Sequence, residues 1–451
     1  MFDISAEVSF TSFLQLAKTE INTRAIRILI FKVVLRKNND MRGYVTLLIA
    51  LVVISCKNEP IKTVSMKEDV VALADDAMGG RQTGTEGELM AAKYIEDRMV
   101  AIGLEPKGDA GVYTQAFTFK KSSNPHEQAE FTNLTEDGAV TGVNVIGYIN
   151  NNAENTVVIG AHYDHLGTGG EGSLYRDDDT SIHNGADDNA SGVAILLALA
   201  KTLKAEQSAN SNYLFIAFSG EEIGLLGSNY FVKNPTIDTK KVSYMINMDM
   251  VGRLNEEKVV AVYGVGTSPR FKQTLFANND QGLSISEHES GVGPSDHTSF
   301  YLADIPVLHF FTGQHSDYHK PGDDSDKLNY EGMEKISAYI LNIVSDLDGA
   351  GKLAFRKTKN ESEEVPAFKV ALGVVPDYLY SGEGMRIDGV SEEKAAQKAG
   401  MQKGDTVIKL GDLDTPDMMS YMKALATFDV GQSTIVTFKR DGEINTVKVT
   451  F

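Results

Sequence analysis

The chain has 451 residues, of which 42% are hydrophobic and 23% are charged, so it can bury a large core and form two or more domains. Its formal net charge of −19 at pH 7 argues against a nucleic-acid partner, because a phosphate-binding surface needs clustered lysine and arginine. The single cysteine, Cys56, excludes a disulfide bond within the chain.

The first recognisable element is an apolar run from Tyr44 to Ile54, preceded by Arg42 and followed by a serine and Cys56. A run of this length is typical of a signal peptide, whereas a transmembrane helix needs about 20 apolar residues. The pattern resembles a bacterial lipoprotein signal, so residues 41–56 are expected to be a signal peptide and Cys56 the lipidated residue. A short core helix or an uncleaved anchor is the alternative.

The expected signal peptide also defines the segments on either side of it. Met41 becomes the expected start, and residues 1–40, which include the basic stretch RAIRILIFKVVLRK, are expected to be a mistaken upstream extension. Residues 57–67 form a polar spacer. The lipid anchor implies contact with a membrane of the bacterial cell envelope, at the outer membrane or cell surface rather than in the cytoplasm.

Residues 68–350 alternate between helical and strand patterns. The segment 86–103 has helical spacing of Leu89, Ala92, Ile95 and Met99 and ends at a glycine. Further helices are expected at 189–205 and 329–347, and strands at 156–161, 213–219, 241–250 and 304–313. This alternation predicts an α/β domain with a mostly parallel mixed sheet covered by helices on both faces.

Histidine and carboxylate residues lie at the carboxyl ends of these strands or in loops: His162 with Asp164 and His165, Asp187 and Asp188 just before a helix, Glu221 and Glu222, Asp249, and His319. Loops at the carboxyl ends of strands carry the binding sites of open α/β sheets. Two histidines and three carboxylates can hold two Zn²⁺ ions with one carboxylate bridging them. Each residue alone is more often a satisfied core residue or a solvated acidic turn, so the prediction rests on their occurring together.

The ordered motifs HYDHLG, NGADDNASG, FSGEEIGLLGS, NMDM and YHKPGDD resemble the secreted bacterial di-zinc aminopeptidases. Relatives of that family include glutamate carboxypeptidases, glutaminyl cyclases and the transferrin receptor. The resemblance covers about residues 68–350. It implies the zinc aminopeptidase-like fold, two Zn²⁺ ions per chain, and hydrolysis of the N-terminal peptide bond of peptide substrates.

The resemblance also implies a ligand set: His162 and Asp249 at one zinc, Glu222 and His319 at the other, and Asp188 as the bridge. Asp188 is chosen over Asp187 because the family's ligand directly precedes the NxSG element. His165 is a less favoured substitute for His162.

Three further residues have expected roles beside the ligands. Glu221 is expected to be the general base that takes a proton from the metal-bridging water. Asp164 is expected to accept the second imidazole N–H of His162 and fix its tautomer. Tyr318 is expected to donate a hydrogen bond to the developing oxyanion, as in some relatives. His297, in the motif SDHTSF, receives no role.

These residues also leave open other functions of the same fold. A glutaminyl cyclase-like acyltransferase would use a nearly identical site with one zinc, but that family has tryptophan before the last histidine, where this chain has Tyr318 and no tryptophan anywhere. A carboxypeptidase-like metallopeptidase is a second alternative, and a non-catalytic receptor-like protein would be expected to have lost ligands. The loops 169–182 and 254–295 contain no residue that decides the preferred N-terminal side chain.

Residues 351–366 are expected to be a linker, because their charged second half lacks apolar spacing. Residues 367–451, with ALGVVPD and AGMQKGDTVIKLG, resemble a PDZ domain of the type associated with bacterial proteases. The resemblance implies that Leu372, Gly373 and Val374 form a loop whose N–H groups receive a C-terminal carboxylate, while the peptide adds a strand to the sheet. A structural β-domain without a ligand is the alternative.

Overall fold

The computed structural model describes residues 64–120, 130–132, 138–170, 172–175, 181–206, 210–358, 369–377, 380, 382–391 and 394–451. The expected upstream extension, the signal peptide with Cys56, and residues 359–366 of the expected linker lie outside the described residues. Among the described residues, no helix has both the length and the apolar character needed to cross a membrane.

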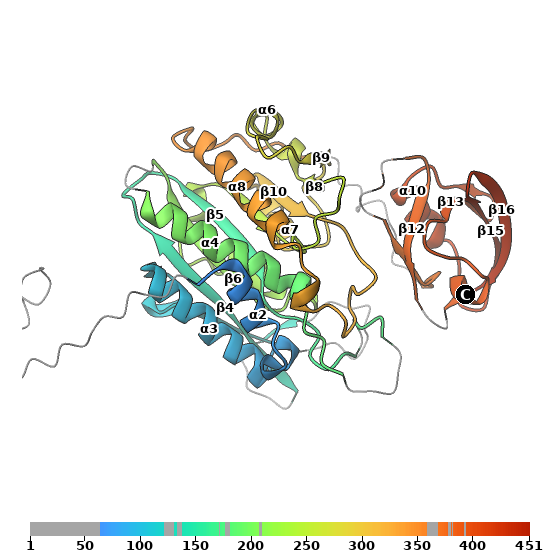
Figure 1. Ribbon diagram of the computed structural model, residues 1–451, viewed down its shortest axis with the longest axis horizontal. Coiled ribbons are helices and arrows are strands. Elements are labelled where there is room, and N and C mark those ends of the chain that lie inside the picture. The colour runs from blue at the N-terminus through green and yellow to red at the C-terminus, as the bar shows by residue number, and fades with distance from the viewer. Residues whose placement is uncertain are drawn as a thin grey trace, which may run out of the picture. The chain divides into compact units, whose positions relative to one another are not determined.

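Ten described strands form the sheet of the α/β part, in the order β3-β2-β4-β6-β5-β7-β10-β8-β9 with β1 beside β4 (Figure 1). Their bounds are β1 (Glu105–Pro106), β2 (Thr114–Lys120), β3 (Glu130–Phe131), β4 (Ala139–Ile149), β5 (Thr156–His162), β6 (Asn212–Phe218), β7 (Val242–Met248), β8 (Val259–Tyr263), β9 (Ser284–Glu287) and β10 (Val307–Phe311).

The four central strands, β6, β5, β7 and β10, are parallel, and β8 and β9 pair in parallel at one edge. Strand β4 is antiparallel to its neighbour β6, and β8 is antiparallel to its neighbour β10. The pairings of β1 with β4, β2 with β3 and β2 with β4 are antiparallel too. The expectation of a mostly parallel sheet is therefore correct only for the centre. Parallel neighbours need a long crossover, and such crossovers contain the helices that follow β5 and β6.

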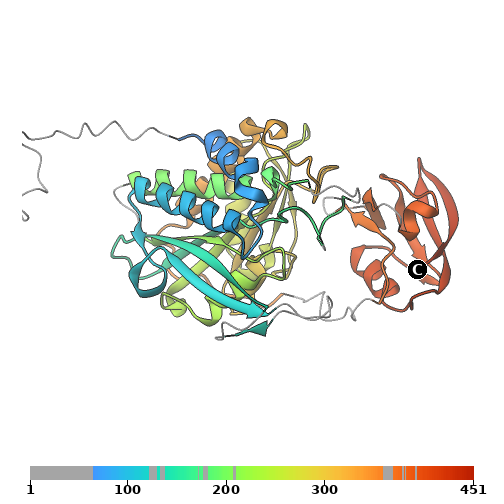
Figure 2. The same ribbon diagram turned by 90° about the horizontal axis from the view of Figure 1, so that it is seen from below.

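Seven described α-helices belong to this part: α2 (Met66–Leu73), α3 (Glu86–Ile102), α4 (Gly192–Ala205), α5 (Leu226–Lys233), α6 (Phe271–Ala277), α7 (His297–Tyr301) and α8 (Tyr330–Leu347). Along β6, Phe215 and its alternate neighbours pack with α3, α4 and α8, whereas Ile216 and Phe218 pack with α5 and α7. Figure 2 shows the blue and green helices α3 and α4 on one side of the sheet. The prediction of helices on both faces is confirmed.

Helix α3 corrects one detail of the predicted core. Ala92, Ile95 and Met99 are buried as expected, but Leu89 is 55% exposed. The neighbouring Glu88 is buried instead, because its carboxylate accepts the main-chain N–H groups of Gly84 and of Val143 in β4. A satisfied carboxylate thus takes the inward position that the apolar pattern assigned to leucine.

Both expected boundaries of the α/β part shift slightly. Helix α2 begins at Met66, inside the expected spacer, after the N-cap residue Ser65. At the other end, Leu353 is buried and the N–H of Arg356 donates to the carbonyl of Thr267 at 2.8 Å. Residues 351–358 therefore pack on the α/β part, and the linker expected from 351 begins later.

The C-terminal residues form a second, smaller sheet with its own apolar core. Its elements are β11 (Val374–Pro376), β12 (Met385–Val390), α9 (Ala395–Lys398), β13 (Thr406–Leu410), β14 (Leu413–Asp414), α10 (Met418–Leu425), β15 (Ser433–Arg440) and β16 (Glu443–Thr450). All described pairings are antiparallel, in the order β11-β12-β13-β15-β16 with β14 beside β13. The expected small β-rich domain is present.

Candidate metal centre

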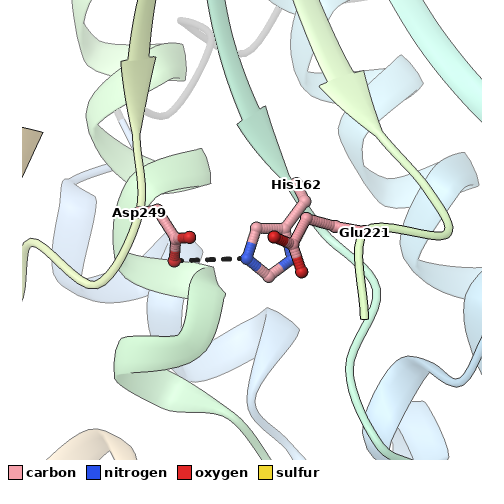
Figure 3. Close-up of side chains that lie close together, drawn as sticks. All are labelled: His162, Glu221 and Asp249. Atoms are coloured by element: carbon pink, nitrogen blue, oxygen red, sulfur yellow. Dashed lines mark hydrogen bonds and ion pairs between the residues drawn. The ribbon is translucent and has the colours of Figure 1, made fainter. Parts of the chain in front are cut away.

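Three parallel strands deliver candidate ligands to one edge of the sheet. His162 is the last residue of β5, Glu221 and Glu222 follow β6 after a two-residue turn, and Asp249 directly follows β7. The register pairs His162 with Phe218, and Gly160 with Asn247, so the chain leaves all three strands at the same level. Figure 3 shows Glu221 and Asp249 reaching His162 from two different strand ends.

Asp188 enters the site from the irregular turn Ala186–Ser191 that precedes α4. The carboxylate of Asp323 accepts the main-chain N–H groups of Asp187 and Asp188 at 2.9 and 3.0 Å. A side chain at Gly185 would lie 2.1 Å from the carbonyl oxygen of Asp188, so only glycine fits there. These contacts fix the backbone from which Asp188 projects.

The carboxylate of Asp188 lies between two histidine–carboxylate pairs. His162 Nε2 is 3.3 Å from Asp188 Oδ1 and 3.2 Å from Asp249 Oδ1. On the other side, His319 Nε2 is 3.2 Å from Asp188 Oδ2 and 3.3 Å from Glu222 Oε2. The structure therefore brings together all five predicted ligands and directs the two oxygens of Asp188 to different pairs.

These distances fit zinc. Two ligand atoms about 2.0 Å from a tetrahedral zinc ion are about 3.3 Å apart, which is the spacing observed here. The Nδ1 atoms of both histidines already face main-chain acceptors, Asp164 O at 3.2 Å and Gly172 O at 2.8 Å. A proton on each Nδ1 leaves the Nε2 lone pair directed at the carboxylates, as in zinc-binding histidines.

The two adjacent glutamates have opposite electrostatic environments. Burial raises the pKa of Glu221 well above its ordinary value, and Asp249 adds to the shift although His162 opposes it. Burial acts in the same direction on Glu222, but His319 and His165 outweigh it and lower the pKa of Glu222 to about 2. A pair with separated pKa values suits one proton acceptor and one permanently charged ligand.

Glu221 also lies near the first ligand pair. Ligand atoms of Glu221, His162 and Asp249 all lie within 4.8 Å of one another. The N–H of Glu221 donates to Asp164 Oδ1 at 3.1 Å, whereas that oxygen is 3.7 Å from His162 Nδ1. The closer acceptor for His162 Nδ1 is the main-chain carbonyl of Asp164, at 3.2 Å, and the Asp164 carboxylate that was expected to orient the histidine instead accepts the N–H of Glu221.

His165 is on the opposite side from its predicted place. Its Nδ1 is 2.7 Å from Glu222 Oε1 and 3.8 Å from Asp188 Oδ2, so it belongs with His319 and is wrong as a substitute for His162. The ring of Tyr318 stacks on His319 with centroids 3.9 Å apart, and its role as an oxyanion donor stays a prediction. His297 is fully buried and stacks on His309, and it is not one of the candidate ligands.

A pocket of about 110 Å³ opens beside the candidate ligands. Its walls beyond the ligands, Glu221 and Tyr318 are Met250, Tyr263, Pro294, His309, Phe311 and Gln314. Burial lowers the pKa of His309 to about 4, so this histidine is neutral at pH 7. The pocket wall therefore contains no charged side chain among the described residues, apart from the candidate ligands and base.

Sequence reasoning missed Arg81, because no local pattern distinguishes it from a surface arginine. Its guanidinium is fully buried and donates to the carbonyls of Tyr163 at 2.6 Å, Asn184 at 2.6 Å and Gly185 at 2.9 Å. Burial lowers the pKa of Arg81 to about 10, so it stays charged. Arg81 therefore ties the loop after β5 to the loop that carries Asp188.

Comparison with known proteins agrees with this geometry. The family model described as "Peptidase family M28" matches residues 144–344. A probable leucine aminopeptidase of Arthroderma otae is 28% identical over 223 residues, which are 47% of this chain and 58% of that protein. The chain spans less than two thirds of the length of the curated relatives it matches.

Two solved structures show the fold. BSAP, a zinc aminopeptidase from Bacillus subtilis, matches with a TM-score of 0.50 and 18% identity, covering 65% of this chain and 98% of that chain. Porphyromonas gingivalis glutaminyl cyclase matches with a TM-score of 0.50 and 17% identity, covering 62% and 97%. These two likenesses concern the fold alone: the α/β part, which contains the family match at residues 144–344, has a zinc aminopeptidase-like fold.

Proposed function

We propose that this chain is a zinc-dependent aminopeptidase that hydrolyses the N-terminal peptide bond of peptides. The observation that carries the proposal is the position of Asp188, whose two oxygens face two separate histidine–carboxylate pairs beside Glu221. Curated relatives named as aminopeptidases support the same activity.

The proposal includes two zinc ions per chain, held by the five candidate ligands with Asp188 shared. When bound, zinc would lower the pKa of a water molecule and polarise the scissile carbonyl. Glu221 accepts the proton of the attacking water and delivers it to the leaving amine. Asp164 holds the backbone of Glu221 in place. Tyr318, at the pocket wall, donates a hydrogen bond to the developing oxyanion.

Glutaminyl cyclase-like acyl transfer is the second candidate, because the fold matches a solved glutaminyl cyclase. At 17% identity that likeness concerns the fold alone. A carboxypeptidase-like peptidase is the remaining alternative on the same site. An aminopeptidase and a cyclase both require a free N terminus and differ in their products, whereas a carboxypeptidase requires a free C terminus.

One purified sample can separate the three. Metal content is measured by mass spectrometry, and the same sample receives amino-acid anilides, N-acetylated peptides and peptides with N-terminal glutamine. An aminopeptidase releases the anilide and requires a free N terminus. Formation of N-terminal pyroglutamate with release of ammonia would indicate a cyclase, and hydrolysis of acetylated peptides from the C terminus a carboxypeptidase. Glu221→Gln serves as the control for contaminating peptidases.

We further propose that residues 367–451 are a PDZ domain that binds a peptide C terminus. Strand β11 pairs with β12 alone among the described strands, which leaves an edge for an added strand. Before it, Gly373 has a φ of +78°, and a Cβ there would lie 2.1 Å from Lys394 Cβ. Fluorescence-labelled peptides test this: binding should be lost when the C-terminal carboxylate is amidated, and equal binding would indicate a different mode.

A lipid anchor at Cys56 and a position on the cell envelope complete the proposal. Both rest on the signal-peptide pattern of residues 41–56. A single acyl chain gives marginal membrane binding, so stable attachment requires the multiple chains of a lipoprotein or a second contact. The folded parts would then work beside the membrane.

A further inference from the structure

The candidate ligand His319 lies in an unusual backbone conformation. Its φ of +52° is in the left-handed region that side-chain-bearing residues rarely adopt. Two hydrogen bonds hold it there: its Nδ1 faces Gly172 O at 2.8 Å, and its own carbonyl accepts the N–H of Leu174 at 3.0 Å. The three-residue segment Gly172–Leu174 therefore contacts both the ring and the main chain of His319.

Ser173, in the middle of this segment, pairs with His183. The two side chains are 3% and 2% exposed, and Ser173 Oγ is 2.8 Å from His183 Nε2. His183 Nδ1 lies 3.1 Å from the carbonyl of Ser181, which can only accept, so Nδ1 carries the ring proton. Nε2 is then the acceptor, and the hydroxyl of Ser173 donates to it.

Neighbouring residues accommodate the Ser173–His183 pair. Ser173 Oγ also accepts the N–H of Tyr175 at 3.0 Å. A Cβ at Gly169 would lie 2.9 Å from His183 Cε1, so the glycine leaves room for the ring. Burial lowers the pKa of His183, which keeps the ring neutral and able to accept.

We propose that Ser173 and His183 are positioning residues for the zinc ligand His319. By holding the segment Gly172–Leu174, they keep a carbonyl at Nδ1 of His319 and so direct its Nε2 lone pair toward the metal. This inference rests on the proposed zinc site. Partners of this kind alter metal affinity by about 10- to 100-fold when they are removed.

The test compares zinc affinity, rather than activity, across a small set of variants. Ser173→Ala and His183→Leu should each weaken zinc at one of two sites by about 10- to 100-fold in competition with a chromophoric chelator, leaving the second site unchanged. His183→Gln keeps an acceptor for the hydroxyl and should lie closer to wild type. In the cobalt-substituted protein, the two damaging variants should also change the visible absorption spectrum.

Ser243→Ala is the matched control. Ser243 is also buried, donates to Gly351 O at 2.7 Å and accepts the N–H of Leu353 at 3.1 Å, at the start of β7 and away from the ligands. It should lower the melting temperature without changing zinc affinity or the cobalt spectrum.

Three results would overturn the inference. The first is a Ser173→Ala variant that matches the control, losing stability but keeping both zinc affinities. The second is equal zinc binding by His183→Leu and His183→Gln. The third is wild-type protein that binds no zinc at all. That result would refute the proposed function itself, and it differs from the first two results, in which the wild type binds zinc. If Ser173→Ala does not fold, the comparison of His183→Leu with His183→Gln decides.

Discussion

The sharpest prediction separates the two adjacent glutamates, Glu221 and Glu222, by replacing each with glutamine. Glu221→Gln removes the proton acceptor but keeps the volume of the side chain. Because burial raises the pKa of Glu221, the neutral amide is no harder to bury than the carboxylate. The variant should therefore fold as well as wild type and retain two zinc ions per chain.

The expected loss of turnover follows from the role of the group. A positioned general base contributes about 10²- to 10⁴-fold, so kcat should fall about 10³-fold, equivalent to about 4 kcal/mol of activation free energy. Glu222→Gln should act differently. Its carboxylate oxygen lies 3.3 Å from His319 Nε2, and its pKa of about 2 keeps it charged at neutral pH. Loss of that charge should remove zinc and activity together.

Metal content by mass spectrometry and kcat on an amino-acid anilide, measured on the same preparations, provide the assay. Glu256→Gln is the control, since Glu256 and Glu257 form another adjacent glutamate pair that is exposed. It should change neither quantity. Equal zinc loss in Glu221→Gln and Glu222→Gln would refute the division of roles, as would a Glu221→Gln enzyme within 10-fold of wild type.

The remaining predictions concern stability, domain boundaries and attachment. Arg81→Met should lower the free energy of unfolding by about 3–5 kcal/mol in urea, because it leaves buried carbonyls unpaired; a loss below 1 kcal/mol would contradict this. A chain ending at Thr358, rather than near Gly351, should bind zinc and cleave small anilides almost normally while handling long peptides or a partner less well, and an equal loss on both substrates would argue that the C-terminal part shapes the active site. Cys56→Ser should move the protein out of the membrane fraction, and unchanged fractionation with a different mature N terminus would count against lipidation. With zinc removed, His309→Phe should flatten the pH dependence of stability: the folded pKa of about 4 lies below the unfolded value of 6.5, so wild type should lose about 2 kcal/mol between pH 7 and pH 5 through this residue alone, and identical slopes would refute the assignment.

Sequence alone predicted the central strands, the long helices and the candidate ligands, for a physical reason. Parallel strands end at one edge, so residues at their carboxyl ends converge without knowledge of any long-range contact. His162, Glu222 and Asp249 come together in this way. The resemblance to known enzymes supplied the choice of Asp188 over Asp187, which local pattern could not make.

Only the tertiary structure decided the parts that depend on contacts between distant segments. Arg81 bonds to a carbonyl 104 residues away, and His319 bonds to one 147 residues away at Gly172. Hydrophobic spacing reports which face of an element is apolar, but not which buried carboxylate will find donors, and so it placed Leu89 where Glu88 lies. The side on which His165 meets the ligands was likewise set by packing across strands rather than by its place beside His162.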